Sequence, residues 1–300
     1  CKKEHIDVLL AVGGGSTIDC TKAIAAAAFY DGDCWDLVKR KAPVTKALPI
    51  LTVLTLAATG SEMECGGVIS NMDTHEKLGL VHPLLFPKVS FLDPENTFSV
   101  NAFQTACGSA DILSHVFDCN YFTADDRMDM ACRIQEEVIR TVVRYAPIAM
   151  KARANLMWAS TWALNGFLDN GISQAAVCHM MEHELSAFYD ITHGLGLAIL
   201  TPRWMEYILD EGTAPQLKRF GTRIFGVDES LSDMEGAKEA INRLSKFLYQ
   251  DLNLQSRLSD LGIDDGHFAE MAQKACNGGI MKSIKDLTPN DVEAIFRMCL

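Results

Sequence analysis

The feature that most constrains the fold of this 300-residue chain is a change of pattern near residue 100. Before it, short apolar runs alternate with glycine- and proline-containing turns. After it, nearly every segment carries the apolar period of an amphipathic helix. The pattern predicts an α/β domain over 1–96 and an all-helical domain over 97–300, divided at DPENT (93–97). The candidate helices are 100–122, 126–151, 152–169, 174–189, 194–210, 215–225, 233–251, 264–277 and 289–299.

The first domain opens with a strand, a glycine turn and a helix. Residues 7–13 (DVLLAVG) have the length and apolar character of a buried parallel strand, and GGGS leads from them into a helical segment. This arrangement binds phosphate when free backbone N–H groups and the positive end of the helix dipole face one point. Alternatively, Ser16 and Asp19 only cap the helix. The loop is not GxGxxG, so the sequence leaves both interpretations open.

Hydroxyl groups gather where a second strand ends. Further short strands are predicted at 49–56, 66–71 and 89–93. Thr55, Thr59 and Ser61 place hydroxyls at the carboxyl end of the first of these, which is where open α/β sheets bind ligands, although such residues also cap turns. Lys77 is a candidate for a ribose or phosphate contact, but a lone lysine is more often only solvated.

The helical half contains two pairs of ligand-type residues. Asp111 and His115 are four apart in GSADILSHVFD, and His179 and His183 are four apart in CHMMEHELSAFYDITHGLG. Each pair projects from one helix face, and His193 follows, with two glycines after it that permit close backbone approach. A single histidine on an apolar helix is more often a core residue, but an unpaired buried aspartate is costly. The pattern therefore indicates a metal cage between helices, without saying which residues bind.

Composition excludes several partners and compartments. The net charge of −12 without a basic patch argues against nucleic acid and anionic membrane surfaces, and no apolar run reaches the roughly 18 residues of a membrane span. Ten cysteines without a CxxC motif indicate reduced thiols in a cytosolic protein rather than a disulfide framework. Because the chain begins at Cys1, directly before a strand, we expect it to lack its true N-terminus.

Four segments together resemble the iron-containing (group III) alcohol dehydrogenases. They are GGGSTIDCTKAIA, LTLAATGSE, GSADILSHVFD and HMMEHELSAFYDITHGLGLAILTP, which occur in the family's order over essentially the whole chain. The similarity is to the branch of butanol dehydrogenases and NAD(P)H-dependent aldehyde reductases. It implies a dehydroquinate synthase-like architecture: a Rossmann-like α/β nucleotide-binding domain, here truncated at its start, followed by an all-α metal-binding domain. It also implies a cytoplasmic homodimer.

The resemblance assigns residues as well. It implies a divalent metal, Fe²⁺ or Zn²⁺, and a non-ligand histidine, His183, beside the nicotinamide. The implied metal ligands are Asp111, His115, His179 and His193. The implied cofactor-binding residues are Gly14, Gly15, Ser16, Asp19, Thr55, Thr59 and Lys77. Because the segment that selects the cofactor is missing, NADP and NAD remain equally open.

The chemistry implied by the resemblance is hydride transfer between NAD(P)H and a small aldehyde or primary alcohol. The metal polarises the aldehyde oxygen, and the proton passes through a relay that includes His183 or water. A metal- and NAD-dependent lyase or cyclase of the dehydroquinate synthase type is the first alternative. It is disfavoured because the segments around Asp111 and His179 lack the Lys and Arg residues that its phosphorylated substrate requires. A non-catalytic metal- or nucleotide-binding module is the second.

Overall fold

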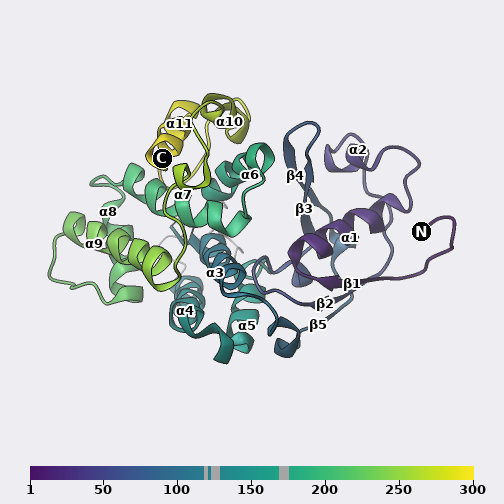
Figure 1. Ribbon diagram of the computed structural model, residues 1–300, viewed down its shortest axis with the longest axis horizontal. Coiled ribbons are helices and arrows are strands. Elements are labelled where there is room, and N and C mark those ends of the chain that lie inside the picture. Colours follow the sequence, from purple (N-terminus) through teal and green to yellow (C-terminus); the bar gives the residue numbers. More distant parts are fainter. Residues whose placement is uncertain (118–120, 123–128, 169–175) are drawn as a thin grey trace.

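The computed structural model describes residues 1–117, 121–122, 129–168 and 176–300. Within these ranges the chain forms a sheet-and-helix half and a helical half, which lie side by side in Figure 1. Both parts of the predicted fold class are therefore confirmed. None of the described helices combines the length and apolar character that a membrane span requires. None of the cysteines in the described ranges forms a disulfide, as predicted.

The first half contains a parallel sheet in the order β1-β2-β5, formed by Leu9–Gly13, Ile50–Leu54 and Val89–Phe91. Helix α1 (Gly15–Ala27) follows β1 directly and buries Ile18 against Ala11 of β1 and Leu54 of β2. The register pairs Gly13 with Leu54, so the two strands end at the same edge of the sheet. This edge brings the glycine loop next to the threonine segment that follows β2.

One expectation for this half, a fully buried first strand, is wrong in detail, and the structure does not show the capping alternative for Ser16 and Asp19. Strand β1 is parallel, but its outer side chains Leu10 and Val12 are 59% and 56% exposed, because only the face that carries Ala11 packs against α1. Helix α1 has Gly14 as its N-cap without a side-chain bond, so Ser16 does not cap it. The carboxylate of Asp19 instead accepts hydrogen bonds from Ser61 and from the Val68 backbone N–H.

Two elements were not predicted. Helix α2 (Cys34–Val38) has only five residues, which is too short for a helical period to be recognised, and a basic segment follows it directly. Strand β4 (Glu76–Val81) pairs antiparallel with β3 (Gly66–Asn71), and Lys77 lies on it rather than in a loop. The hairpin rises between the two halves in Figure 1, and β4 contacts helix α6 (Val177–Tyr189) of the helical half.

All of the predicted helices are present. Their predicted parts at 118–120, 126–128, 169 and 174–175 lie outside the described residues, and most of the other bounds are shorter than predicted. Besides α6 the helices are α3 (Ala102–Val116), α4 (Asp129–Tyr145), α5 (Arg153–Ala163), α7 (His193–Ile208), α8 (Ala214–Phe220), α9 (Asp233–Lys246), α10 (Phe268–Ala275) and α11 (Pro289–Met298). Helix α7 crosses the core, where Leu197, Ile199 and Trp204 are almost completely buried. Helix α11 begins with a reciprocal capping box formed by Thr288 and Asp291.

Helices α3 and α7 approach unusually closely where the two predicted glycines begin α7. A methyl group on Gly194 would lie 2.0 Å from the carbonyl oxygen of Cys107 on α3, and one on Gly196 would lie 2.8 Å from Cγ of Glu182 on α6. Only glycine fits between backbones at these distances. The contacts set the start of α7 against both neighbouring helices and place its first residue, His193, between them.

Candidate active site

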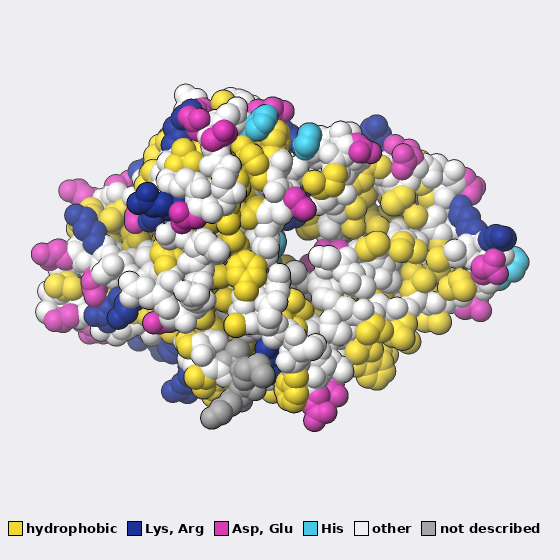
Figure 2. Space-filling view, viewed as in Figure 1, with side chains coloured by type: hydrophobic (Ala, Val, Ile, Leu, Met, Phe, Trp, Pro, Cys, Tyr) yellow, Lys and Arg dark blue, Asp and Glu magenta, His cyan; other side chains and the backbone are white. Residues whose placement is uncertain are grey.

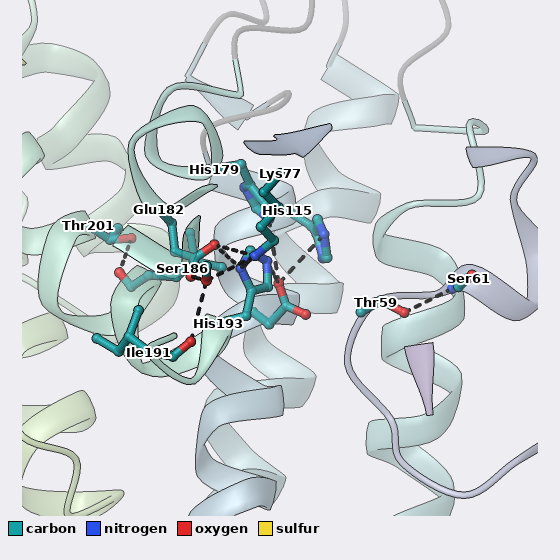
Figure 3. A network of polar contacts seen from close by, with 12 residues as sticks. Thr59, Ser61, Lys77, His115, His179, Glu182, Ser186, Ile191, His193 and Thr201 are labelled. Atoms are coloured by element: carbon teal, nitrogen blue, oxygen red, sulfur yellow. Dashed lines mark hydrogen bonds and ion pairs between the residues drawn. The ribbon is translucent and has the colours of Figure 1, made fainter. Parts of the chain in front are cut away.

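Three histidine side chains converge on one carboxylate oxygen. Asp111 and His115 extend from α3, His179 extends from α6, and His193 is the first residue of α7. The Nε2 atoms of His179, His193 and His115 lie 3.5, 3.5 and 3.6 Å from Oδ1 of Asp111. Figure 3 shows the three imidazoles gathered at this point from their separate helices.

These separations fit a bound metal ion. Ligand atoms about 2.1 Å from a tetrahedral metal are about 3.4 Å from one another, close to the observed N–O spacing. Oδ1 of Asp111 is buried and has no hydrogen-bond partner among the described residues at ordinary distance. Coordination of a cation by Oδ1 would supply the partner that this buried oxygen lacks within the described part of the chain. Asp111, His179 and His193 also meet the mutual spacing of a metal site, and His115 adds a third nitrogen as the fourth ligand atom.

Electrostatics favour an ionised Asp111. Burial by itself raises the pKa of this carboxyl group, but His115, His193 and His179 outweigh burial and hold the pKa well below its usual range. A deprotonated carboxylate and neutral imidazoles are the forms that bind metal. For His183, burial, reinforced by Lys77, lowers the pKa well below its ordinary value, so this side chain is neutral near pH 7.

A second polar cluster lies behind His193. Nδ1 of His193 is in hydrogen-bond contact with Glu182, whose side chain is completely buried. Lys77 extends from β4 and donates to Glu182 and to Ser186, at 3.0 Å in both cases. Ser186 in turn donates to the other carboxylate oxygen of Glu182. Figure 3 shows Lys77 reaching this cluster alongside the histidines.

The contacts of Glu182 differ from those of Asp111. Glu182, His183 and His193 also meet the spacing of a metal site. However, the Lys77 ammonium already occupies the neighbourhood of the Glu182 carboxylate. Burial alone would raise the pKa of Glu182, but His193 and Lys77 outweigh burial and hold that pKa below its ordinary value.

The glycine loop lies across the same cavity. Gly15 approaches Thr59 so closely that an added methyl group would be 2.4 Å from Oγ1 of Thr59. Below the loop, the fully buried Lys22 donates to Ser61 at 2.8 Å, and Ser61 donates to Asp19 at 2.5 Å. Asp19 therefore belongs to the wall that supports the loop, and its carboxylate is already engaged.

A cavity of about 540 Å³ joins the two halves. Figure 2 shows the surface hollowed between them. Residues at the cavity from the predicted cofactor set are Gly14, Gly15, Ser16, Asp19, Thr59 and Lys77, and those from the metal half are Asp111, His115, His179, His183 and His193. Thr55 is not among the lining residues, and its N–H donates to Gly13. Asp111 and the glycine loop therefore line the same cavity, although they are nearly a hundred residues apart in the sequence.

Sequence reasoning missed Glu182, Ser186 and the reach of Lys77 to them. One signal was present: Glu182 lies three residues after His179, and Ser186 follows four residues later on the same apolar helix. A carboxylate on a buried face requires partners, but the sequence does not show that one partner comes from a strand about a hundred residues earlier.

A nucleotide-type α/β half, a helical half and an Asp/His cage in the cleft between them define a two-domain, metal-dependent enzyme. Residues 1–94 match the family model for iron-containing alcohol dehydrogenases, and residues 105–300 match the C-terminal model of the Fe-containing alcohol dehydrogenase family. The chain therefore belongs to the iron-containing alcohol dehydrogenases. The predicted family and the predicted enzyme class, an NAD(P)-dependent oxidoreductase of alcohols and aldehydes, are both confirmed.

Relatives cover almost the whole chain. The NADH-dependent butanol dehydrogenase A of Clostridium acetobutylicum is 47% identical over 99% of this chain and 78% of its own length. The NADPH-dependent aldehyde reductase YqhD of Escherichia coli is 34% identical, over 91% of this chain and 72% of its own length. Among solved structures, the NADH-dependent butanol dehydrogenase A of Thermotoga maritima is 35% identical with a TM-score of 0.92, covering 99% of this chain and 77% of that structure.

Proposed function

We propose that this protein reduces small aldehydes to primary alcohols with NADH or NADPH, and catalyses the reverse oxidation, at a divalent metal in the cleft. The observation that carries the proposal is the single cavity that joins the glycine loop to the Asp/His cage. A hydride donor bound at the loop and a carbonyl bound at the cage would then share one space. Butanol-type substrates are the expected class, since relatives are named as butanol dehydrogenases.

Asp111, His115, His179 and His193 are the proposed metal ligands. When bound, the metal supplies Lewis-acid polarisation of the substrate oxygen, and the nicotinamide supplies hydride. Fe²⁺ and Zn²⁺ both suit three nitrogens and one carboxylate. The residues themselves provide a fixed, preorganised cage, because Asp111 is 2% exposed and its α3 helix is held against α7.

His183 is the proposed catalytic residue. It lines the cavity one helical turn after His179, and its ring lies 5.9 Å from that of His193, centroid to centroid. This position beside the cage suits transfer of a proton between the substrate oxygen and water.

The cofactor half has its own assignments. Gly14, Gly15 and Ser16 offer backbone N–H groups to the pyrophosphate at the start of α1. Thr59 and Lys77 line the path towards the ribose, and Asp19 supports the loop. Thr55 contributes indirectly, because its backbone N–H donates to the carbonyl of Gly13 at the start of the glycine loop. We further propose a cytoplasmic homodimer, with the two domains divided at residues 96 and 97.

The test uses the purified protein, stripped with a chelator and then restored with Fe²⁺ or Zn²⁺. Oxidation of NADH and of NADPH is followed by absorbance with butyraldehyde as substrate. Metal-restored oxidation is the expected result, and the cofactor with the higher kcat/KM identifies the physiological one. Tight metal binding without oxidation of either cofactor by any aldehyde would contradict the proposal and favour the lyase or the binding module.

A further inference from the structure

We propose that Glu182 is a positioning residue that selects the metal-binding tautomer of His193 and connects this ligand to Lys77 on the nucleotide-binding half. The inference rests on the proposed function only in taking His193 as a metal ligand. It concerns a carboxylate that does not reach the metal cage and that lies on the opposite side of the His193 ring.

The first step is the tautomer. A neutral imidazole carries one N–H, and the nitrogen without hydrogen binds metal. Nε2 of His193 faces Asp111 at 3.5 Å, whereas Nδ1 faces Glu182. A carboxylate accepts hydrogen bonds and donates none when ionised. Glu182 therefore favours the form with hydrogen on Nδ1 and leaves the lone pair of Nε2 directed into the cage.

The second step is the position of Lys77. Its Nζ lies 3.1 Å from Nδ1 of His193 and 3.0 Å from Oε2 of Glu182. Nδ1 cannot both carry a proton and accept one from an ammonium group. With Glu182 ionised, the ammonium instead donates to Oε2 and to Ser186 at 3.0 Å. Glu182 thus prevents Lys77 from taking the Nδ1 lone pair, which would direct the N–H of Nε2 at the metal.

The third step is the number of donors. Lys77, His193 and Ser186 all direct hydrogens at the two oxygens of Glu182. A glutamine at this position offers one oxygen and an NH₂ group, so at least one of the three donors would face another donor. The Glu182 side chain also packs tightly against the α7 backbone at Gly196. A methyl group added to Gly196 would lie only 2.8 Å from Cγ of Glu182. Charge and position are both required there.

The connection crosses the cleft. Lys77 belongs to β4 and Glu182 to α6, and the side chain of Glu182 is completely buried while that of Lys77 is 12% exposed. Because the pair is largely buried, removal of either partner would leave an uncompensated charge, which costs more than the loss of a surface pair. The same carboxylate therefore orients a ligand on the metal side and a cation on the cofactor side.

The experiment compares Glu182→Gln with Glu184→Gln in the full chain. Glu184 is a matched control because it lies on the same helix and pairs with a lysine, Lys274, at 3.3 Å outside the cavity. Zn²⁺ affinity is measured by competition with a chelator, without any alcohol or cofactor. We expect Glu182→Gln to weaken Zn²⁺ binding about 10- to 100-fold and Glu184→Gln to leave it unchanged.

A spectroscopic measurement distinguishes positioning from a general structural role. ¹⁵N-labelled histidine shifts, with the His193 signals assigned by their loss in His193→Ala, report which nitrogen carries hydrogen. The parent protein is expected to show Nδ1–H, with Nε2 bound to Zn²⁺, and Glu182→Gln is expected to show a mixture of tautomers without metal. Coordination of Zn²⁺ through Nδ1, or an unchanged tautomer in Glu182→Gln, would overturn the proposal.

A milder variant covers the possibility that Glu182→Gln does not fold. Ser186→Ala keeps the Glu182 carboxylate but removes its hydroxyl donor and one acceptor of the Lys77 ammonium, and a few-fold loss of Zn²⁺ affinity is expected. Affinity equal to that of the parent in both variants would refute the role of Glu182. Because these readouts need no turnover, a protein that binds Zn²⁺ as expected but reduces no aldehyde would refute the proposed function alone.

Discussion

The hydroxyl of Thr161 connects the helical half of the molecule to the sheet-containing half through a buried hydrogen bond. It lies on α5 and donates at 2.6 Å to Glu62, which directly follows Ser61 beneath the glycine loop. Thr161 is fully buried and Glu62 is 2% exposed. A hydrogen bond to a charged group contributes about 1.5–3 kcal/mol, so Thr161→Val, which keeps the shape, should destabilise the protein by that amount.

The loss should depend on pH in a defined direction. Burial raises the pKa of Glu62 above 4.5, and the Thr161 hydrogen bond partly opposes this by stabilising the ionised form. A carboxyl group with a raised folded-state pKa lowers stability as pH rises through the window between its unfolded and folded values. Removal of the hydroxyl raises the folded pKa further. The deficit of Thr161→Val should therefore be larger at about pH 8 than at about pH 5.

Thermal unfolding of the metal-free protein measures this effect. For a chain of this length, 1.5–3 kcal/mol corresponds to a decrease in Tm of about 2–5 °C. Thr201→Val is the control, because Thr201 is equally buried but donates to the neutral Leu197 carbonyl within its own helix. Equal decreases for both variants, or a Thr161→Val deficit that does not grow with pH, would refute the reasoning.

Three further outcomes are expected at the site. His193→Ala should lose metal and activity together, and full metal content by elemental analysis would contradict its role as a ligand. His183→Ala should retain its metal while kcat falls about 10²-fold or more, whereas loss of metal would make it a ligand instead. Gly15→Ala, whose methyl group would lie 2.4 Å from Oγ1 of Thr59, should weaken cofactor binding about tenfold in a titration followed by NADH fluorescence. Gly279→Ala, with no atom nearer than 3.7 Å to its methyl group, should not weaken it.

Local periodicity accounts for the accurate part of the sequence analysis. The spacing of four between Asp111 and His115 corresponds to one helical turn, so the pairing on one face required no tertiary information. The positions of β2 and the glycine loop followed from apolar runs in the same way. Strand β4 was missed because Gly79 and the charged residues Glu76 and Lys77 interrupt its alternation. Its β character depends on pairing with β3.

The sequence by itself determined the family, the two-part architecture and the candidate ligands, because these depend on motifs and on contacts within one helical turn. Only the tertiary structure brought His193 to Asp111, since close packing of α3 against α7 at Gly194 sets that distance. It alone also brought Lys77 to Glu182, 105 residues away. A contact between distant residues depends on how whole elements pack, and no local pattern encodes that packing.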